Sequence, residues 1–306
     1  MSIKRRELLL LSSLSVGIAV IGKMLHAQAK AQDEVSYTTS TPEKKQIDTQ
    51  QQTLLLRFVS LADVGTGDRK QYAVAEAMKH YYQQHPFPAV LLAGDNIYRN
   101  GTIKKIARAF EQPYSYLRQQ GVKFFACLGN HDIRIANGNH QVQYPEFNMS
   151  GRYYTFRRGP VQFFALDTNR NAAWQHQLTW LEQELNRSKA PWKVVFGHHP
   201  LYSSGRYRFS RRLAPKLKPL FENYGVQLYI NGHEHHYERT HSISGTTYVT
   251  CGSGARTRSV GRSSWTAHAA SRLSFAAFDV YSDRLVIQGV DANGTVFDRA
   301  AIGLQG

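Results

Sequence analysis

The sequence predicts an α/β protein, because apolar runs and polar residues alternate along it in a regular way. Five short runs end in side chains suited to metal binding: SLADVG, LLAGDNIY, CLGNHD, VVFGHHP and LYINGHEHH. Runs rich in β-branched and aromatic residues are typical of buried strands. The carboxyl ends of such strands are where an α/β sheet presents its functional site. We therefore expect one site built from several strand ends.

The remaining elements are predicted from their periodicity. Residues 71–82 follow the first run and favour a helix. A second helix is expected before VVFGHHP, because four apolar residues recur on one face. These four residues are Trp174, Leu178, Leu181 and Leu185. Near the end of the chain, the apolar segments 278–280 and 285–287 flank Ser282-Asp283 and predict a hairpin. No internal repeat is present.

The polar residues at the ends of the five runs form a coherent set of metal ligands. The set comprises Asp63, Asp95, Tyr98, Asn130, His198, His233 and His235. Oxygen donors and imidazoles without a thiolate suit iron, zinc or manganese and argue against a cysteine-based zinc site. Seven donors are too many for one ion with open positions, but they fit two ions that share a carboxylate. This chemistry predicts hydrolysis at phosphorus or at an acyl centre.

Each of these residues also has an ordinary structural explanation. An aspartate or asparagine at a strand end commonly caps a turn, and a tyrosine there is commonly half-buried packing. Seven such residues in one constellation favour the metal site.

The same segments resemble the calcineurin-like metallophosphoesterases and, within them, the purple acid phosphatase branch, which includes the tartrate-resistant acid phosphatases. The wider superfamily begins with D-x-H, whereas this chain has Asp63-Val64-Gly65 and lacks the histidine. The branch instead uses the tyrosine of G-D-x-x-Y, which is Gly94-Asp95-Asn96-Ile97-Tyr98 here. The GNHD, GHxP and GHxH elements follow in family order, and the resemblance covers about residues 54–255. It implies a layered α/β/β/α sandwich with two central mixed sheets.

The resemblance also implies how the metals are held. The first metal is expected to bind four ligands, namely Asp63, Asp95, Tyr98 and His235. The second is expected to bind Asp95, Asn130, His198 and His233, so that Asp95 bridges the two ions. A phenolate from Tyr98 favours Fe³⁺ at the first position. The second ion is Zn²⁺, Fe²⁺ or Mn²⁺, and the sequence does not separate them.

Two further residues are expected to be catalytic by the same resemblance. His131 resembles the family histidine that contacts phosphate and aids departure of the leaving group. Asp132 is expected to orient that histidine. The neighbouring His199 and His236 do not fit the family spacings, and we expect them in the pocket wall or at the surface.

The function expected from these features is hydrolysis of phosphate monoesters by attack of a metal-activated hydroxide. The substrates are then phosphorylated small molecules or nucleotides. One alternative is a phosphodiesterase or nucleotide hydrolase that uses the same metal site. A less favoured alternative is a basic polyanion-binding protein with a degenerate site, although no motif for specific nucleic-acid recognition is present. The oligomeric state is not indicated.

Charge supports an anionic substrate without identifying it. The formal net charge is +16, and such an excess concentrates anions near the protein. Arginines cluster in two segments, at Arg206, Arg208, Arg211 and Arg212 and at Arg256, Arg258 and Arg262. The first cluster either borders the site, where arginine recognises phosphate bidentately, or belongs to a solvated loop.

The first 53 residues predict export rather than catalysis. Residues 1–31 combine a basic start, an apolar run and small-x-small sites, which is the architecture of a signal peptide and not of a membrane span. Arg5-Arg6 resembles a twin-arginine signal, or is a plain basic start. Residues 32–53 are expected to form a flexible linker, and 54–306 a single domain. We expect a periplasmic or secreted protein, or a membrane-anchored one if the signal is retained. The two cysteines, Cys127 and Cys251, are either bonded or free and buried.

Overall fold

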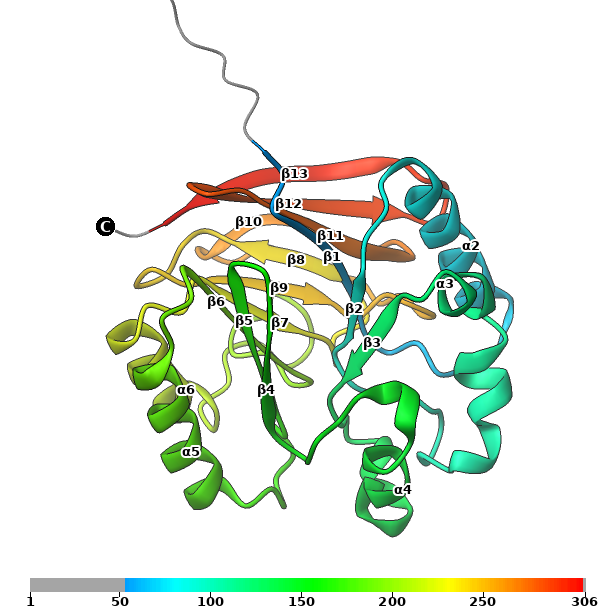
Figure 1. Cartoon of the computed structure of the whole chain (residues 1–306), viewed down its shortest axis with the longest axis horizontal. Coiled ribbons are helices and arrows are strands. Elements are labelled where there is room, and N and C mark those ends of the chain that lie inside the picture. Colours follow the sequence, from blue (N-terminus) through cyan, green and yellow to red (C-terminus); the bar gives the residue numbers. More distant parts are fainter. Residues whose placement is uncertain (1–52, 305–306) are drawn as a thin grey trace, which may run out of the picture. The chain divides into compact units, whose positions relative to one another are not determined.

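The strands of residues 53–304, the part of the chain that the computed structural model describes, form two mixed sheets (Figure 1). The predicted signal peptide, and the predicted linker up to residue 52, lie outside the described residues. The first sheet, called the β1 sheet below, has the order β13-β12-β11-β1-β2-β3. The second, called the β6 sheet, has the order β10-β8-β9-β7-β6-β5-β4.

The bounds of the strands are β1 (Leu56–Leu61), β2 (Ala89–Leu92), β3 (Lys123–Ala126), β4 (Tyr154–Arg158), β5 (Val161–Leu166), β6 (Trp192–Gly197), β7 (Leu228–Asn231), β8 (Tyr237–Thr240), β9 (Thr247–Cys251), β10 (Thr266–Ala270), β11 (Ser274–Val280), β12 (Arg284–Asp291) and β13 (Val296–Gly303). The α-helices are α2 (Arg69–Gln84), α3 (Ser115–Gln119), α4 (Asn139–Val142), α5 (Trp174–Arg187) and α6 (Ala214–Asn223). Shorter 3₁₀ or π turns are η1 (Ile103–Lys105), η2 (Ala107–Glu111), η3 (Asp132–Arg134), η4 (Ala136–Gly138) and η5 (Pro145–Phe147).

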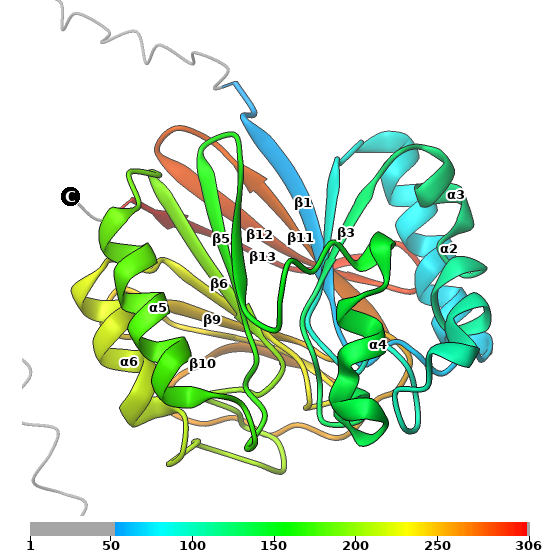
Figure 2. The ribbon, with the colours of Figure 1, turned by 60° about the horizontal axis from the view of Figure 1, so that its bottom comes forward.

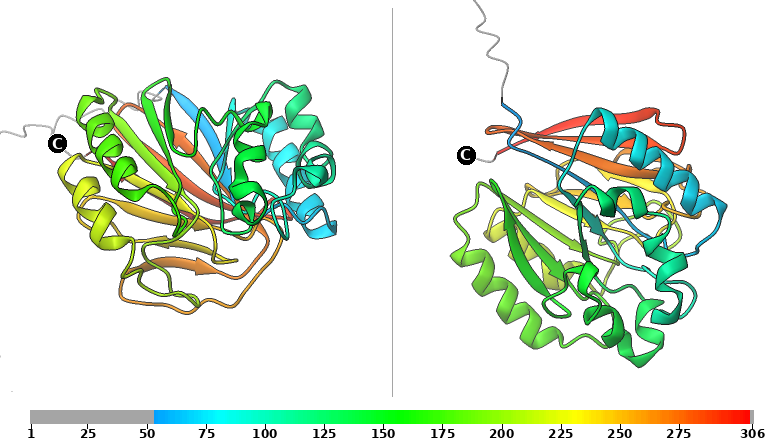
Figure 3. Two further views of the ribbon diagram at one scale, coloured as in Figure 1. Left: turned by 90° about the horizontal axis from the view of Figure 1, so that it is seen from below. Right: turned by 45° about the vertical axis from the view of Figure 1, so that its right-hand side comes forward.

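Helices cover the outer face of each sheet, so that the layers run α/β/β/α. Helices α5 and α6 lie on the side of the β6 sheet, and α2 and α3 lie on the side of the β1 sheet (Figure 2). Both views in Figure 3 keep these two groups of helices on opposite sides of the sheets. The predicted fold class is therefore confirmed, and so are the predicted helices, which correspond to α2 and α5. The predicted hairpin corresponds to β11 and β12.

Helix α2 begins where the sequence provides a cap. The carboxylate of Asp68 accepts hydrogen bonds from the backbone N–H groups of Lys70 and Gln71, at 3.0 and 3.2 Å. These bonds satisfy donors that have no partner within the helix. Val74, Met78 and other buried residues then recur every three or four positions and face the β1 sheet, as a helical period requires.

Aromatic side chains fill the space between the two sheets. The ring of Phe58 on β1 meets that of Phe163 on β5 edge to face, with 5.0 Å between centroids, and stacks on Phe278 of β11 at 4.6 Å. Trp192 at the start of β6 is fully buried in the same core. Burying one such side chain stabilises the fold by about 1.5–3 kcal/mol, and this core fixes the sheets against each other.

Several parallel strands bring the site together. Strand β1 pairs in parallel with β2, and β2 with β3, in the β1 sheet. In the β6 sheet, β5, β6 and β7 are parallel neighbours. Because parallel neighbours end at the same edge of a sheet, the loops that follow them are gathered at one side of the sandwich.

Two other features bear on the sequence analysis. Cys127 and Cys251 are free, buried thiols. Among residues 53–304, no helix is long and apolar enough to cross a membrane.

An ion pair joins the outer strand of one sheet to the other sheet, and it generates a prediction about stability. Asp298 on β13 is 5% exposed and accepts hydrogen bonds from Arg239 at 2.8 Å and from the hydroxyl of Tyr237 at 2.7 Å, both on β8. Burial alone would raise the pKa of Asp298, but these hydrogen bonds and the charge of Arg239 lower it below 3.8. The carboxylate therefore stabilises the fold above that pH, and its contribution is lost as the pH falls through the folded-state pKa.

We expect Asp298→Asn to lower the free energy of unfolding at pH 7 by about 1–3 kcal/mol, because it leaves the partly buried guanidinium of Arg239 without its carboxylate. Urea unfolding of chelator-treated protein at pH 7 and pH 3 measures this, and the difference from wild type should shrink at pH 3. The matched control is Glu76→Gln, which removes an exposed ion pair on α2 and should change stability little. A difference that stayed constant between the two pH values would contradict the assignment.

Candidate metal centre

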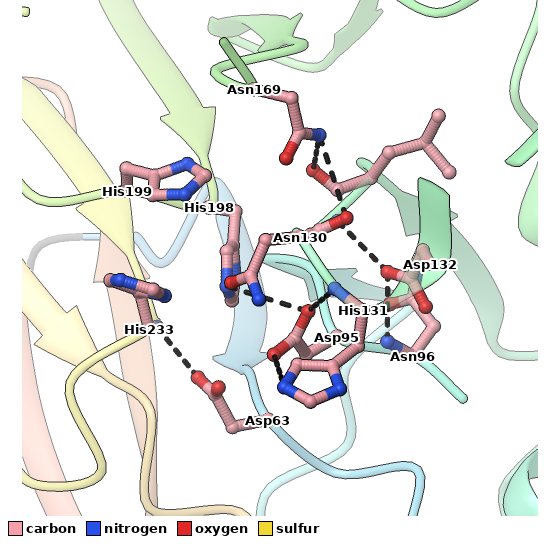
Figure 4. A network of polar contacts seen from close by, with 12 residues as sticks. Asp63, Asp95, Asn96, Asn130, His131, Asp132, Asn169, His198, His199 and His233 are labelled. Carbon is pink, nitrogen blue, oxygen red and sulfur yellow. Dashed lines mark hydrogen bonds and ion pairs between the residues drawn. The ribbon is translucent and has the colours of Figure 1, made fainter. Parts of the chain in front are cut away.

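The five predicted motifs all follow strands that end at the gathered edge. Their predicted ligands follow β1, β2 and β3 in the β1 sheet and β6 and β7 in the β6 sheet. Backbone hydrogen bonds hold the loops together: Asp63 N–H donates to the carbonyl of Gly94 at 3.0 Å, and Gly232 N–H donates to that of His198 at 2.9 Å. Figure 4 shows the resulting convergence of aspartate, asparagine and histidine side chains.

Three of the seven predicted ligands have a left-handed backbone. The φ angles are 59° at Asp63, 54° at Asp95 and 67° at His233. This conformation is uncommon outside glycine, although Asp and His adopt it more readily than most residues. Each residue turns the chain sharply at a strand end and directs its side chain toward the others. Strained backbone of this kind is typical of functional sites.

Two glycines allow the loops to approach each other this closely. A Cβ atom at Gly129 would lie 2.2 Å from Oδ1 of Asp95, and one at Gly232 would lie 2.5 Å from Oδ2 of Asp63. A side chain at either position would displace a predicted ligand. The glycine of GNHD and that of GHxH therefore make room for the two carboxylates.

The first predicted metal position is assembled around Asp63. Its Oδ1 accepts a hydrogen bond from the hydroxyl of Tyr98 at 2.8 Å and lies 3.3 Å from Nε2 of His235. The hydroxyl of Tyr98 is also 3.3 Å from the same nitrogen of His235. Oδ2 of Asp63 accepts the backbone N–H of His233 at 2.7 Å. Three of the four ligands predicted for this metal are thus in mutual contact.

The second predicted position is assembled around His198. Its Nε2 lies 3.2 Å from Oδ1 of Asn130 and 3.5 Å from Oδ1 of Asp95. Its Nδ1 lies 3.0 Å from the carbonyl of Ala93, so Nδ1 carries the proton and Nε2 is left to bind a metal. The ring of His233 completes the group, 5.1 Å from that of His198 between centroids.

The two positions are adjacent. Ligand atoms of Asp63, Asp95 and His198 all lie within 4.8 Å of one another, as do those of His198, His199 and His233. All seven predicted ligands are therefore brought to one place, with Asp95 and His198 between the two groups.

The chemistry of this donor set fits metal ions. Asp63 and Asp95 are 0% and 2% exposed, and within residues 53–304 no lysine or arginine is in ion-pair distance of either carboxylate. Burying carboxylates without cations is costly, and bound metal ions would remove that cost. Burial, with the neighbouring His198, lowers the pKa of His233 to about 3. His233 is therefore neutral, which is the form that binds metal.

The electrostatics at Tyr98 point in the same direction. Burial and the carboxylates of Asp63 and Asp95 raise the pKa of Tyr98 far above its ordinary value of 10. Without added positive charge the phenol keeps its proton. Only a strongly charged cation between these oxygens would make it a phenolate ligand.

His131 lies beside the centre without joining either group of ligands. Its Nδ1 contacts the backbone carbonyl of Arg99, and its Nε2 is 3.9 Å from Oδ2 of Asp95 and 3.4 Å from the guanidinium of Arg134. The ring packs edge to face on Tyr98, with 4.6 Å between centroids. This placement is consistent with the predicted contact to substrate. Arg134 was not singled out in the sequence, since its position three residues beyond His131 is not part of a motif.

Asp132 was expected to orient His131, but no hydrogen bond joins its carboxylate to the ring of His131 in the described structure. Its two oxygens accept four hydrogen bonds, and three come from backbone N–H groups, at Asn96, Ile97 and Gly129. The fourth comes from the side chain of Gln141 at 3.0 Å. The buried carboxylate therefore holds two ligand-bearing loops together. It acts on His131 through the backbone, because its hydrogen bonds are made with loop amides and Gln141, while Nδ1 of His131 contacts the carbonyl of Arg99.

A pocket of about 650 Å³ opens beside the second metal position. Asn130 and His233 line it, and so does His199, as the sequence analysis expected for the pocket wall. The ring of Tyr207 stacks on His233 with 4.3 Å between centroids. Three arginines of the first cluster also line the pocket, so that cluster borders the site. His236, in contrast, is fully buried and lies 3.3 Å from Glu238.

Two features in or beside this pocket were not predicted from the sequence. Arg170 lines it and follows β5, whose segment FFALDTNR is a sixth apolar run that ends in polar residues. The pattern of an apolar run followed by polar residues, which marks the other strand ends, also marks the segment of Arg170. Glu234 is fully buried between two predicted ligands, and its Oε1 accepts the backbone N–H of Tyr207 at 2.6 Å. No sequence pattern indicates that contact.

Comparisons with known proteins agree with the site. A family model described as calcineurin-like phosphoesterase matches residues 56–237. Purple acid phosphatase 7 of Arabidopsis thaliana is 29% identical over 234 residues, which are 66% of this chain and 70% of that protein. Tartrate-resistant acid phosphatase type 5 of Mus musculus is 27% identical over 240 residues, or 66% and 73% of the two chains.

Solved structures show the same fold. GAP50, described as the anchor in the inner membrane complex of Plasmodium, superposes with a TM-score of 0.72 at 24% identity, over 83% of this chain and 90% of that one. A purple acid phosphatase from seeds of yellow lupin, Lupinus luteus, gives a TM-score of 0.67 at 19% identity, over 81% and 53%.

The predicted resemblance to the purple acid phosphatases is confirmed by these relatives, and they imply a dinuclear metal centre of the kind that the donor set fits. The family match covers more than half of the chain and spans all seven predicted ligands. The chain therefore belongs to the calcineurin-like phosphoesterase family, a family of phosphoric ester hydrolases.

Proposed function

We propose that this protein is an acid phosphatase that hydrolyses phosphate monoesters at a dinuclear metal centre. The observation that carries the proposal is the burial of Asp63 and Asp95 among imidazoles, without any lysine or arginine partner in the described chain. Such an arrangement is costly for the protein alone and favourable once cations are bound. The named purple acid phosphatases among its relatives support the same activity.

The proposed ligand sets follow the two groups in the structure. One ion is held by Asp63, Tyr98 and His235, the other by Asn130, His198 and His233, and Asp95 is shared. Fe³⁺ is proposed for the position of Tyr98, because a phenol beside two carboxylates needs a strongly charged cation to lose its proton. Zn²⁺, Fe²⁺ or Mn²⁺ is proposed for the other. When bound, the metal pair lowers the pKa of water and polarises the phosphoryl oxygens.

His131 is proposed to donate a proton to the leaving group. Since Nδ1 donates to the carbonyl of Arg99, Nε2 is the nitrogen that exchanges a proton at the open side of the site. Burial and the neighbouring Arg134 lower the pKa of His131 below 6.5, although the contact with Arg99 opposes them. The protonated ring is therefore available only in acidic solution, which favours an acid phosphatase.

Export is proposed from the sequence alone. The basic, apolar and small-residue pattern of residues 1–31 supports a cleaved signal, and a periplasmic or secreted location follows from it. Sequencing the amino terminus of protein recovered from fractionated cells tests this. A mature protein that begins at Met1 would contradict cleavage.

The function is tested by comparing 4-nitrophenyl phosphate with bis(4-nitrophenyl) phosphate. We expect metal-dependent turnover of the monoester at acidic pH, with kcat/KM at least about tenfold higher than for the diester, because a diester needs contacts for a second substituent. Chelation should abolish both activities, and added metal should restore them. A preference for the diester would favour the phosphodiesterase alternative. Polyanion binding by metal-free protein without any turnover would favour the degenerate site.

His131→Ala should lower kcat by roughly two to four orders of magnitude while both metals stay bound, since acid–base assistance is worth about that much. The ratio of wild-type to variant kcat should fall as the pH rises and the wild-type ring loses its proton. Metal analysis and a pH profile measure the two effects. The matched control is His140→Ala, an exposed histidine nearby in the sequence, which should behave as wild type. Loss of metal in His131→Ala would make His131 a ligand instead.

Tyr98→Phe should remove a visible absorption band if the phenolate binds Fe³⁺, because the colour arises from phenolate-to-iron charge transfer. The visible spectrum and the iron content of the purified protein measure this, and Tyr114→Phe, a buried tyrosine outside the site, is the control. A colourless wild type with zinc or manganese at both positions would contradict the ferric assignment alone. Colour that persists in Tyr98→Phe would show that Tyr98 is not a ligand.

A further inference from the structure

The pocket beside the second metal position is basic as well as large. Besides Asn130 and His233, its lining includes four arginines. They are Arg170, Arg208, Arg211 and Arg212. The loop that follows β5 contributes the first, and the segment after β6 contributes the other three. Two loops that are separate in the sequence therefore place positive charge on one cavity.

These arginines have no acid to neutralise them within residues 53–304. None of the four takes part in an ion pair there, and the carboxylate at the end of β5, Asp167, is already used. Its Oδ2 binds the guanidinium of Arg152 at 2.8 Å, and its Oδ1 accepts the backbone N–H of Asn169 at 3.0 Å. The positive charge of the pocket is consequently left for an anion from solution.

Arg212 is the most constrained of the four. One of its nitrogens, Nη2, donates to the carbonyl of Thr168 at 2.8 Å, and the guanidinium lies over the ring of Trp174 at 5.6 Å. The other, Nη1, is buried and has no hydrogen-bond acceptor among the described residues. A buried donor without an acceptor costs free energy, and a ligand oxygen would satisfy it.

The same contacts connect Arg212 to the metal position. The hydroxyl of Thr168 is 2.8 Å from Nδ1 of His199, and the ring of His199 lies 4.5 Å from that of His233 between centroids. The side chains of Arg212, His199 and His233 therefore line one continuous wall of the pocket. A substrate whose scissile phosphate sits at the metals would extend its leaving group along this wall.

We propose that this pocket binds a second phosphoryl group of the substrate, and that Arg170 and Arg212 are its main contacts. The substrates are then organic bisphosphates or polyphosphates rather than simple monoesters. In the reaction, the oxygen of water bonds to the phosphorus at the metals, and the bond between that phosphorus and the departing oxygen breaks. The departing oxygen takes up a proton from the water. The second phosphoryl group leaves intact as part of the leaving group. This inference rests on the proposed function and adds the class of substrate to it.

The chemistry is matched to phosphoryl oxygens in particular. Guanidinium groups bind phosphate through two parallel charge-assisted hydrogen bonds, and such bonds are stronger than neutral ones. A nucleoside diphosphate and an inorganic polyphosphate both carry such a second phosphoryl group. The exposed ring of Tyr207 beside His233 offers a stacking surface to the first and nothing to the second.

The test compares two substrates whose leaving groups differ only by the distal phosphoryl group, 3-hydroxypropyl phosphate and propane-1,3-diyl bisphosphate, on the metal-loaded protein. We expect kcat/KM to be at least about tenfold higher for the bisphosphate, the usual worth of one charge-assisted hydrogen bond. Arg170→Gln, at an exposed position, should lower this ratio by about tenfold, and Arg212→Lys should lower it less because the charge remains. Arg187→Gln, at an exposed arginine on α5, is the matched control and should keep the ratio. Comparing kcat/KM for ADP and for tripolyphosphate then shows whether the natural substrate is a nucleoside diphosphate or an inorganic polyphosphate. A preference for either one supports the proposal.

A binding measurement separates this inference from the proposed function. Calorimetric titration with propane-1,3-diyl bisphosphonate and with propylphosphonate, which are not hydrolysed, should show tighter binding of the bisphosphonate to wild type. That advantage should be lost in Arg170→Gln. Equal affinity for the two phosphonates, or an equal ratio of kcat/KM in wild type and Arg170→Gln, would overturn the proposal even if monoesters are hydrolysed. Selective binding without any hydrolysis would uphold the pocket and refute the phosphatase.

Discussion

The rest of the site depends on two carboxylates that are buried where the sheets meet. Asp63 and Asp95 are nearly inaccessible, and the basic side chains within ion-pair distance of them in the described chain are imidazoles. Burial alone would raise the pKa of Asp63, but the charges of His198 and His235 lower it to about 2. Asp63 therefore keeps its negative charge before any ligand binds, whereas burial raises the pKa of Asp95 above its ordinary value. The left-handed turns and the two close glycines all serve to bring these carboxylates together.

The two sheets contribute different kinds of donor to the site, so the site depends on how the sheets are packed together. Loops after strands of the β1 sheet supply oxygen donors, the carboxylates of Asp63 and Asp95 among them. Loops after the β6 sheet supply imidazoles, such as those of His198 and His235. Each sheet alone offers only one kind of donor. The aromatic core around Phe58 and Phe163 fixes the distance between the sheets, so packing far from the surface sets the geometry of the donors.

Much of this arrangement was predictable from the sequence, because it is written in local patterns. Apolar runs mark the strands, and a polar residue at the end of each run marks the edge that carries the site. The sequence also shows that Gly65 stands where the wider superfamily has a histidine, and that Tyr98 is present as the alternative ligand. The structure gives the reason: a Cβ at Gly65 would lie 2.0 Å from the carbonyl oxygen of Asn96, in the segment that carries Tyr98. That position has no room for a histidine.

Other features were not predictable, because they are contacts between segments without a pattern. Asp132 was expected to orient His131. It accepts hydrogen bonds from backbone amides of another loop, and sequence spacing does not reveal which amides are near. Arg170 follows the apolar run of β5, which resembles the other five runs. It was not predicted because no predicted metal ligand follows that run. The role of Glu234 depends on a turn of the chain that brings Tyr207 back to it.

The contact between Glu234 and Tyr207 has a thermodynamic consequence. Glu234 lies between the predicted ligands His233 and His235, and it binds the backbone of the segment whose tyrosine ring stacks on His233. Any ion that orders these histidines also orders the loop, and anything that fixes the loop restricts the histidines. Binding at the two places is then reciprocal, because linkage requires each to change the affinity of the other by the same factor. An anion that fixes the loop would therefore raise the affinity of the site for metal by the same factor as bound metal raises the affinity for the anion.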